Sequence, residues 1–336
     1  STQKIILGWI PCLETLHRSI DSLCFLNIIN TSMINGTNDT RYAFVNGVIR
    51  AKEARLLKKS HFERLIDANI ENFGSILSDT FYTGTGDFSE ILKGVEIEER
   101  KFFKKYCLHY EIKQLVFLPE AIHNLKVRLK NGDTILLYDV EIEDLESSPE
   151  VMAIVVQYLK HRNSFILATE LDKLLCKKLY ELSRVSQFFY EYFQLYFDLE
   201  NIRSFFRARQ FEDPAEIFKQ VYIEYGTIAK EKYIQNLNKS YDVIIREFRD
   251  TRYSQLIEQG STYLKSRGSF LKLERLCDEM KLQFLRIARF YTFGIEPLFG
   301  YYQFRMAEIR KLRQVFMGKK YNIPSVELKE SIPDVW

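Results

Sequence analysis

The chain has 336 residues, of which 46% are hydrophobic and 28% are charged, and its formal net charge is +3. This apolar fraction excludes a wholly disordered chain, and the charged fraction excludes a protein made mostly of membrane-spanning segments. The 14 glycines and 7 prolines fall below the usual shares of about 7% and 5%. With so few helix breakers, the sequence predicts an all-α protein.

The charges are unevenly distributed along the chain. Residues 41–64 carry seven Lys or Arg against two Glu, and residues 305–320 carry six against one. Residues 139–150 carry six acids and no base. Such patches are either solvated helix faces or surfaces that dock onto a complementary partner. The net charge is too small to indicate a nucleic-acid partner, because the acidic segment offsets the basic ones.

Residues 1–40 differ from the rest of the chain. The apolar stretch 5–29 is interrupted by charged or titratable residues, so it is not a convincing membrane span; these are Glu14, His17, Arg18 and Asp21. No clear signal peptide precedes it. The stretch is either a docked helix or an upstream piece joined before a natural start at Met33, and we favour the second reading. We therefore expect removal of residues 1–32 to leave folding intact.

From residue 42 onward a helical period dominates. The expected helices cover 42–59, 61–68, 70–81, 90–130 with a break near Leu118-Pro119, 150–210 in two or three pieces, a helix starting near Pro214, 241–293 with interruptions near Gly260 and Gly268, and 298–317. Ser60 is the expected N-cap of the second helix, with Glu63 completing a capping box, and Pro214 and Pro324 suit first helical turns. Residues 134–140 are the one credible strand.

One helical unit recurs in the sequence. When Glu53, Asn201 and Glu308 are aligned as anchors, the same residue classes recur around them. An aromatic stands nine residues before each anchor, an apolar residue four before and an arginine two after: Phe44, Tyr192 and Phe299; Ile49, Phe197 and Phe304; Arg55, Arg203 and Arg310. A weaker fourth copy, residues 124–130, keeps its basic residue as Lys126. This pattern predicts three similar repeats, at 41–130, 131–235 and 236–336, after an extension at 1–40.

We find no catalytic set. The five histidines show no metal-ligand spacing, and residues 83–87 lack the pattern of a phosphate loop. No Gly-x-Ser-x-Gly elbow is present. The five cysteines are scattered without a CxxC pair, which is typical of a reduced protein with core cysteines. We expect no catalytic residue, no cofactor and no metal, although an enzyme with a spatially assembled site stays an alternative.

The repeated arginine is the best candidate for function. Arg203 and Arg207 continue the helical line of Tyr192 and Tyr196, and a lone guanidinium on an apolar face must pair, snorkel or line a cavity. Each Arg could form a salt bridge to a neighbouring helix. Alternatively, the three equivalent arginines could surround a central opening that meets a partner. The partner-binding candidates are Arg55, Lys126, Arg203, Arg207 and Arg310.

Three motifs carry a family resemblance. They are residues 41–57, the stretch Asp198-Leu-Glu-Asn-Ile-Arg203, and residues 293–301 together with Ala307-Glu-Ile-Arg310. In order and spacing they resemble the C subunit of the bacterial and archaeal V-type (A/V-type) ATPases, called the d subunit in eukaryotic vacuolar enzymes. The resemblance runs from about residue 42 to 330. Gly47-Val48 stands where the family usually has Ala-Arg.

The resemblance implies an all-α funnel of three similar helical domains with pseudo-threefold symmetry. It also implies a non-catalytic central-stalk subunit whose partners are the central-shaft subunits and the proteolipid ring. Such a protein is peripheral to the membrane, on its cytoplasmic face. The alternative is a helical-repeat adaptor with unrelated partners, and a nucleic-acid binder comes third. The sequence does not choose between H⁺ and Na⁺ coupling, or between ATP synthesis and hydrolysis.

Overall fold

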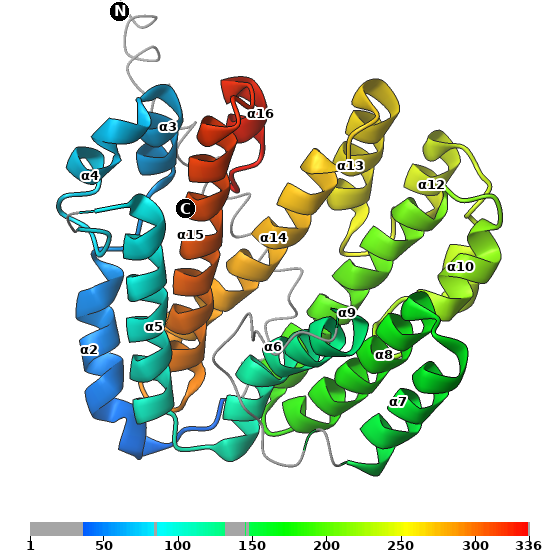
Figure 1. Ribbon diagram of the computed structural model, residues 1–336, viewed down its shortest axis with the longest axis horizontal. Helices are drawn as coiled ribbons and strands as arrows, with labels where there is room; N and C mark the ends of the chain where they lie inside the picture. The colour runs from blue at the N-terminus through cyan, green and yellow to red at the C-terminus, as the bar shows by residue number, and fades with distance from the viewer. Residues whose placement is uncertain (1–35, 84–85, 132–144, 146–147, 335–336) are drawn as a thin grey trace, which may run out of the picture. The chain divides into compact units, whose positions relative to one another are not determined.

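The computed structural model describes residues 36–83, 86–131, 145 and 148–334, which belong to one compact unit, Gly36–Trp336. Every regular element in this part of the chain is a helix, so the all-α prediction is confirmed (Figure 1). The helices of the first half are η2(Thr40–Tyr42), α2(Ala43–Glu53), α3(Lys59–Asp67), η3(Ile70–Asn72), α4(Phe73–Ile76), α5(Phe88–Tyr106), α6(Tyr110–Asn131) and α7(Pro149–His161). Those of the second half are α8(Ser164–Ser183), α9(Gln187–Ala208), α10(Pro214–Val221), α11(Lys230–Ile234), α12(Tyr241–Glu247), α13(Ser254–Arg267), α14(Leu271–Leu285), η4(Arg286–Phe290), α15(Glu296–Lys320) and α16(Ser325–Glu330).

Two long helices organise the packing. Helix α9 lies among α8, α10 and α14, and helix α15 contacts α2, α3, α5 and α14. Both helices are buried on several faces rather than along one stripe, as expected for helices surrounded by others. Phenylalanine fills these contacts: Phe189 on α9 meets Phe299 on α15 with ring centroids 5.0 Å apart. The aromatic-rich sequence therefore serves helix–helix packing.

The break expected near Leu118-Pro119 is wrong. Helix α6 continues through Pro119 from Tyr110 to Asn131. A proline inside a helix costs about 3 kcal/mol because it removes one backbone hydrogen bond. The residues around it, from Leu115 to Leu125, are largely buried, and α6 packs against α8. This burial outweighs the local preference.

The interruption expected near Gly260 is also wrong, whereas the one near Gly268 is confirmed. Helix α13 runs through Gly260, where a Cβ atom would lie 2.7 Å from a Leu273 side-chain carbon on α14. The glycine thus permits close helix packing rather than a break. Gly268 ends α13 in the left-handed conformation, with φ of 65°, which glycine adopts without strain. The preceding break falls instead between α12 and α13.

The first repeat helix is shorter than predicted. Helix α2 ends at Glu53 instead of residue 59. After it, the backbone N–H of Leu57 donates a hydrogen bond of 2.5 Å to the buried carboxylate of Glu308.

The predicted capping box at Ser60 is wrong as well. Helix α3 begins at Lys59, and the backbone N–H of Lys58 donates a hydrogen bond to the His61 ring. Within 70–81, helix extends only through 70–76.

Each predicted repeat helix is followed by a short helix: α3 after α2, α10 after α9, and α16 after α15. Pro214 occupies the first turn of α10 as predicted, and Pro324 lies just before α16. The threefold arrangement, the funnel and the repeat boundaries stay predictions. Residues 1–35, including the proposed start at Met33, and the possible strand at 134–140 lie outside the described residues. No helix in the described part is long and apolar enough to cross a membrane.

Candidate functional site

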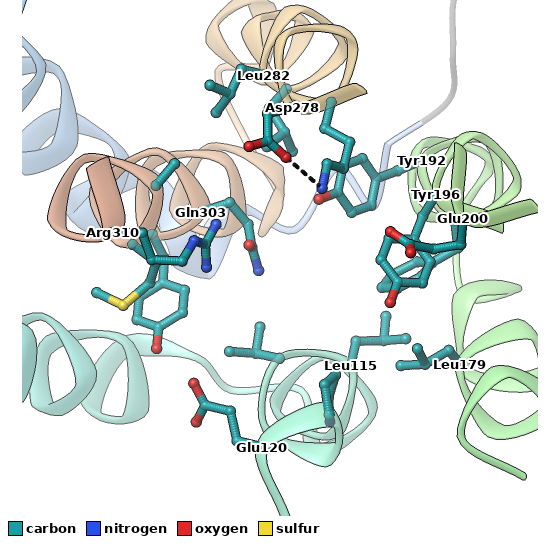
Figure 2. Close-up of a pocket in the computed structure, with 18 of the residues that line it drawn as sticks. Leu115, Glu120, Leu179, Tyr192, Tyr196, Glu200, Asp278, Leu282, Gln303 and Arg310 are labelled. Atoms are coloured by element: carbon teal, nitrogen blue, oxygen red, sulfur yellow. Dashed lines mark ion pairs between the residues drawn. The ribbon is translucent and has the colours of Figure 1, made fainter. Parts of the chain in front are cut away.

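A central cavity of about 450 Å³ lies between helices α6, α9, α14 and α15. Figure 2 shows Arg310 and Gln303 of α15 on one wall, with Tyr192 and Tyr196 of α9 facing them and Glu120 of α6 completing the ring. Of the five predicted partner-binding residues, Arg310 lines this cavity. Arg203 does not line it, but forms ion pairs with two carboxylates that do, Glu200 and Asp278.

Arg203 is held in an ion-pair cluster between α9 and α14. Its guanidinium donates 3.0 Å to Asp278 and lies 2.7 Å from a Glu274 oxygen, and it also pairs with Glu200 one turn earlier. Arg207 shares Glu274 at 2.7 Å. The full cluster joins four cations to three carboxylates: Arg203, Arg207, Lys281 and Lys311 with Glu200, Glu274 and Asp278. Arg203 thus forms the interhelical salt bridges that were one of its two readings.

Asp278 is the acceptor at the centre of this cluster. Burial acts to raise the pKa of its carboxyl, but Lys281, Lys311 and Arg203 outweigh that effect and hold the pKa well below its ordinary value. The carboxylate therefore stays ionised, and the cluster carries one net positive charge (four cations minus three carboxylates).

Arg55 and Lys126 are also engaged within the chain. Arg55 donates 2.6 Å to the carbonyl of Thr80 and stacks over Phe81, with its guanidinium carbon 4.3 Å from the ring centroid. Lys126 on α6 pairs with Asp172 on α8. The cavity lining contains neither residue. Arg55, Arg203 and Arg310 therefore do not form a ring around this cavity, because only Arg310 lines it.

Arg310 differs from the other four. Its side chain is exposed and points into the cavity (Figure 2). Among the lining cations, Lys281 and Lys311 pair with Asp278, whereas no acidic partner for Arg310 occurs among the described residues. Beside it, the hydroxyl of Tyr302 is buried without a hydrogen-bond partner in the described part of the chain. Among the described residues, Arg310 is therefore a cavity-lining cation without an acidic partner, whereas the Tyr302 hydroxyl is buried and is not accessible from the cavity.

Two polar pairs on the repeat helices were not singled out from the sequence. On α9, Asp198 accepts from the N–H of Thr227 at 2.7 Å and from Tyr253 at 2.7 Å, while Asn201 exchanges hydrogen bonds with the backbone of Ile223. Both side chains are fully buried. They fasten the 222–228 loop to α9. Gly226 lies against Asp198, where a Cβ atom would overlap the carboxylate.

The corresponding pair on α15 is Arg305 and Glu308, also fully buried. Arg305 donates 3.1 Å to Glu99 of α5 and 2.8 Å to Tyr82, and it pairs with Glu308. Burial raises the pKa of Glu308, an effect opposed by Arg305 and by the Leu57 N–H. Both networks could have been found from the sequence. In each, two polar residues three positions apart stand in an otherwise apolar helix, and the second of them is the aligned anchor, Asn201 or Glu308.

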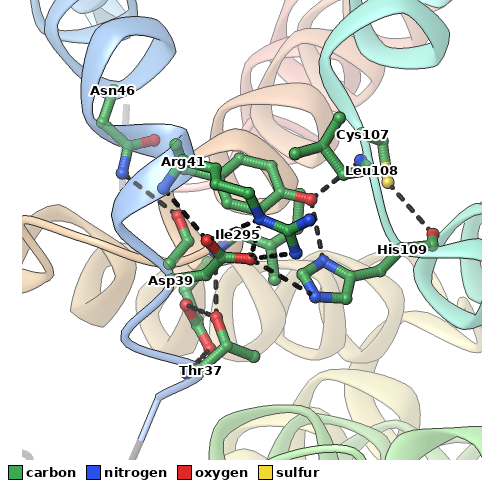
Figure 3. Close-up of polar contacts among 11 residues, drawn as sticks. Thr37, Asp39, Arg41, Asn46, Cys107, Leu108, His109 and Ile295 are labelled. Atoms are coloured by element: carbon green, nitrogen blue, oxygen red, sulfur yellow. Dashed lines mark hydrogen bonds and ion pairs between the residues drawn. The ribbon is translucent and has the colours of Figure 1, made fainter.

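A third polar network joins the starts of α2, α6 and α15 (Figure 3). The Tyr42 hydroxyl accepts from the Leu108 N–H at 2.8 Å and contacts His109 Nδ1 at 2.8 Å, and His109 Nε2 lies 3.7 Å from Asp39. Glu296 accepts from Thr37 at 2.7 Å. Exposed apolar side chains surround these segments: Phe44, Leu108, Tyr110 and Phe293.

None of these networks has the composition of a metal or nucleophile site. No group of three or more His, Cys, Asp or Glu side chains that could hold a metal occurs in the described residues. Burial raises the pKa of Cys107 to about 12 and that of Tyr42 to about 12, so both remain protonated at neutral pH. Cys107, Cys176 and Cys277 are buried and free, as predicted; Cys12 and Cys24 lie outside the described residues.

Comparison with known proteins agrees with these features. Residues 45–331 match the family described as ATP synthase (C/AC39) subunit. The chain belongs to this family. It is 22% identical to the C subunit of the V-type sodium ATPase of Enterococcus hirae over 326 residues, covering 88% of this chain and 99% of the relative. It is 24% identical to the C subunit of the A-type ATP synthase of Desulfurococcus sp. (strain SY) over 339 residues, covering 88% and 92%.

Membership of the ATP synthase (C/AC39) subunit family confirms the resemblance found in the three sequence motifs. The C subunit of these ATPases is structural, so this chain is a non-catalytic subunit of a V/A-type ATPase. The arginines and polar networks described above accordingly take no part in bond making or breaking. Partner contact by the five basic residues stays a prediction.

Proposed function

We propose that this C/AC39 subunit is the central-stalk element that links the rotating shaft of a V-type ATPase to its membrane rotor ring. The observation that carries the proposal is the match over nearly the whole length of its C-subunit relatives. On this proposal the chain is peripheral to the membrane at its cytoplasmic face, and its partners are the central-shaft subunits and the proteolipid ring.

The buried networks support a role in transmitting torque. A rotor element must keep its helices in register under load, and buried polar contacts between helices fix the position of one helix against the next. Arg305 and Glu308 tie α15 to α5 and to the segment after α2, and Asp198 ties α9 to the 222–228 loop. These contacts make a change of helix register costly, because each slip would strand a buried charge.

Two surfaces support docking at separate places on the chain. The cavity with Arg310 lies between α6, α9, α14 and α15, whereas the exposed apolar group of Phe44, Leu108, Tyr110 and Phe293 lies at the starts of α2, α6 and α15. Exposed apolar side chains gathered on adjoining segments are typical of interaction sites. We assign the cavity to the shaft and the apolar group to the ring.

Reconstitution with the shaft subunits and the proteolipid ring from the same organism tests the proposal. We expect the chain to bind each partner separately, to bridge them in one complex on size-exclusion chromatography, and to hydrolyse no ATP. The double variant Phe44→Glu/Leu108→Glu should lose the ring while keeping the shaft. A chain that binds neither partner contradicts the proposal and favours an adaptor with other partners.

A further inference from the structure

The connection between α5 and α6 gathers lysines that have no acidic partner. Residues 101–113, the α5–α6 turn, carry one carboxylate, Glu111, and four lysines: Lys101, Lys104, Lys105 and Lys113. Among the described residues, none of the four lysines has an ion-pair partner. The α5–α6 turn therefore presents an unmatched positive charge at one end of the helix pair.

Helix capping does not account for this charge. Lys104 and Lys105 stand in the last turn of α5, where cations interact favourably with the negative end of the helix dipole. Lys113 is the fourth residue of α6, near the positive end of that helix, where a cation is disfavoured. Lysines elsewhere on the chain are neutralised, as where Lys178 on α8 lies 2.9 Å from Glu150. The α5–α6 turn thus holds more positive charge than its helix ends favour.

The lysines of α5 are positioned for contact with an anion. Lys101, Lys104 and Lys105 fall at i, i+3 and i+4, so they share one helix face, and all three are exposed. The ammonium groups of Lys104 and Lys105 lie 5.2 Å and 5.1 Å from the ring centroids of Phe117 and Tyr106. The rings support the aliphatic stems of these side chains, while the charges stay at the surface. An anion can therefore bind without first breaking an ion pair.

Exposed apolar side chains lie beside the lysines. Leu108 and Tyr110 in the same turn are 52% and 58% exposed. Phe44 of α2 is 72% exposed and contacts Tyr106, with ring centroids 6.5 Å apart. Figure 3 shows Leu108 next to Arg41 at the start of α2. Lysine, tyrosine and exposed apolar side chains on adjoining segments are typical of proteins that contact the headgroup region of a membrane.

The choice of lysine favours a lipid over a protein as the occupant. The α5–α6 turn contains four lysines and no arginine. Lysine is depleted in protein–protein interfaces, where arginine is enriched. Lysines next to a membrane, in contrast, attract the phosphate groups of anionic lipids, each raising the affinity about fivefold. In the part of the chain that the structure describes, no helix could cross a membrane, so this contact would be made at the surface.

We infer that the α5–α6 turn binds anionic lipid headgroups at the membrane surface, with its four lysines as the contacts to phosphate. The inference rests on the proposed function for the orientation of this end toward the membrane, and it adds a lipid partner to the protein partners. Phe44 and Leu108 remain the contacts assigned to the ring, and the lysines beside them contact the lipid.

The test is co-sedimentation of the full chain with two kinds of vesicle, phosphatidylcholine alone and phosphatidylcholine with phosphatidylglycerol. The wild type should bind the phosphatidylglycerol vesicles more tightly, with an affinity that falls between about 50 mM and about 300 mM salt. Lys104→Gln/Lys105→Gln should weaken this binding about 30-fold, which is about fivefold for each lysine. The matched control is Lys219→Gln/Lys239→Gln, because both lysines are exposed and lie outside the α5–α6 turn; it should bind as the wild type does.

Two further measurements separate lipid contact from folding and from ring contact. Both variants should melt within about 2 °C of the wild type, because exposed side chains without ion pairs contribute little to stability. Lys104→Gln/Lys105→Gln should also keep the wild-type affinity for the proteolipid ring purified in detergent. The apolar stretch 5–29 is the same in every variant, so any contribution that it makes to vesicle binding cancels in the comparison.

The possible results distinguish the inference from the proposed function. If the wild type binds both kinds of vesicle equally, or if the two double variants bind alike, the inference is wrong while the proposed function stands. A loss of ring binding by Lys104→Gln/Lys105→Gln in detergent would assign the lysines to the ring and would also overturn the inference. If the wild type binds anionic vesicles as expected but not the ring, the proposed function fails and the lipid contact stands.

Discussion

Two arginines on α15 stand five residues apart and have opposite surroundings. Arg305 is completely buried and contacts the carboxylates of Glu99 and Glu308, whereas Arg310 is exposed in a cavity without a carboxylate partner among the described residues. Five residues along a helix turn the side chain by about 140°, so the two point to different neighbours. An arginine on a repeat helix is therefore either held in a buried ion pair or left unpaired. The outcome depends on whether a neighbouring element places a carboxylate beside it.

The largest expected effect comes from Arg305. Arg305→Gln should lower the free energy of unfolding by about 4 kcal/mol, because it leaves the carboxylate of Glu308 buried without its cation and leaves Glu99 with Lys52 alone. Arg310→Gln, the matched change on the same helix, should lower it by less than about 0.5 kcal/mol. Urea unfolding of the two variants measures the difference. Equal losses would remove the distinction between the two sites.

Arg203 should fall between these two. Arg203→Gln leaves Asp278 with Lys281 and Lys311, so the carboxylate keeps cations nearby. We expect a loss of about 2 kcal/mol in the free energy of unfolding, by the same measurement. A loss as small as that of Arg310→Gln would mean that the α9–α14 ion pairs contribute nothing net, as many exposed pairs do.

Acid titration sharpens the comparison for the same cluster. The pKa of Asp278 is lowered in the folded state, so its contribution is fully present above its ordinary pKa near 3.8 and is lost as the pH falls toward the folded value. Below pH 4 the stability of the wild type should fall more steeply than that of Asp278→Asn, by at most about 1.4 kcal/mol per pH unit. Parallel curves between pH 5 and pH 2.5 would show that Asp278 is not stabilised by its cations.

A small effect of opposite sign, a gain in stability, is expected at a carboxylate that has only neutral donors. Glu296 is buried against Thr37 and Ser186, and burial raises its pKa. A raised carboxyl pKa gives a contribution that is present below pH 4.5 and is lost as the pH rises through the folded value. Glu296→Gln should therefore be up to about 1 kcal/mol more stable than wild type at pH 7.5 and no more stable at pH 4. A destabilised variant at pH 7.5 would show that the charge itself holds the 36–39 segment.

The sequence determined the helical class and the family. Scarce glycine and proline, a 3.6-residue period and three spaced motifs were enough, because these properties are local and additive along the chain. The same reasoning located α9 and α15, the short helices that follow them, and the break at Gly268. It also placed Arg310 among five candidates for partner contact.

Only the tertiary structure decided how those local preferences were used. Pro119 stays inside α6 because packing against α8 offsets its lost hydrogen bond, and Gly260 stays inside α13 because α14 approaches it closely. The residues that pair with Arg203 on α14 lie more than 70 positions away, and none of them pairs with Arg310. Sequence spacing places a guanidinium on a helix face, but the neighbouring helix decides whether that guanidinium is neutralised or left free.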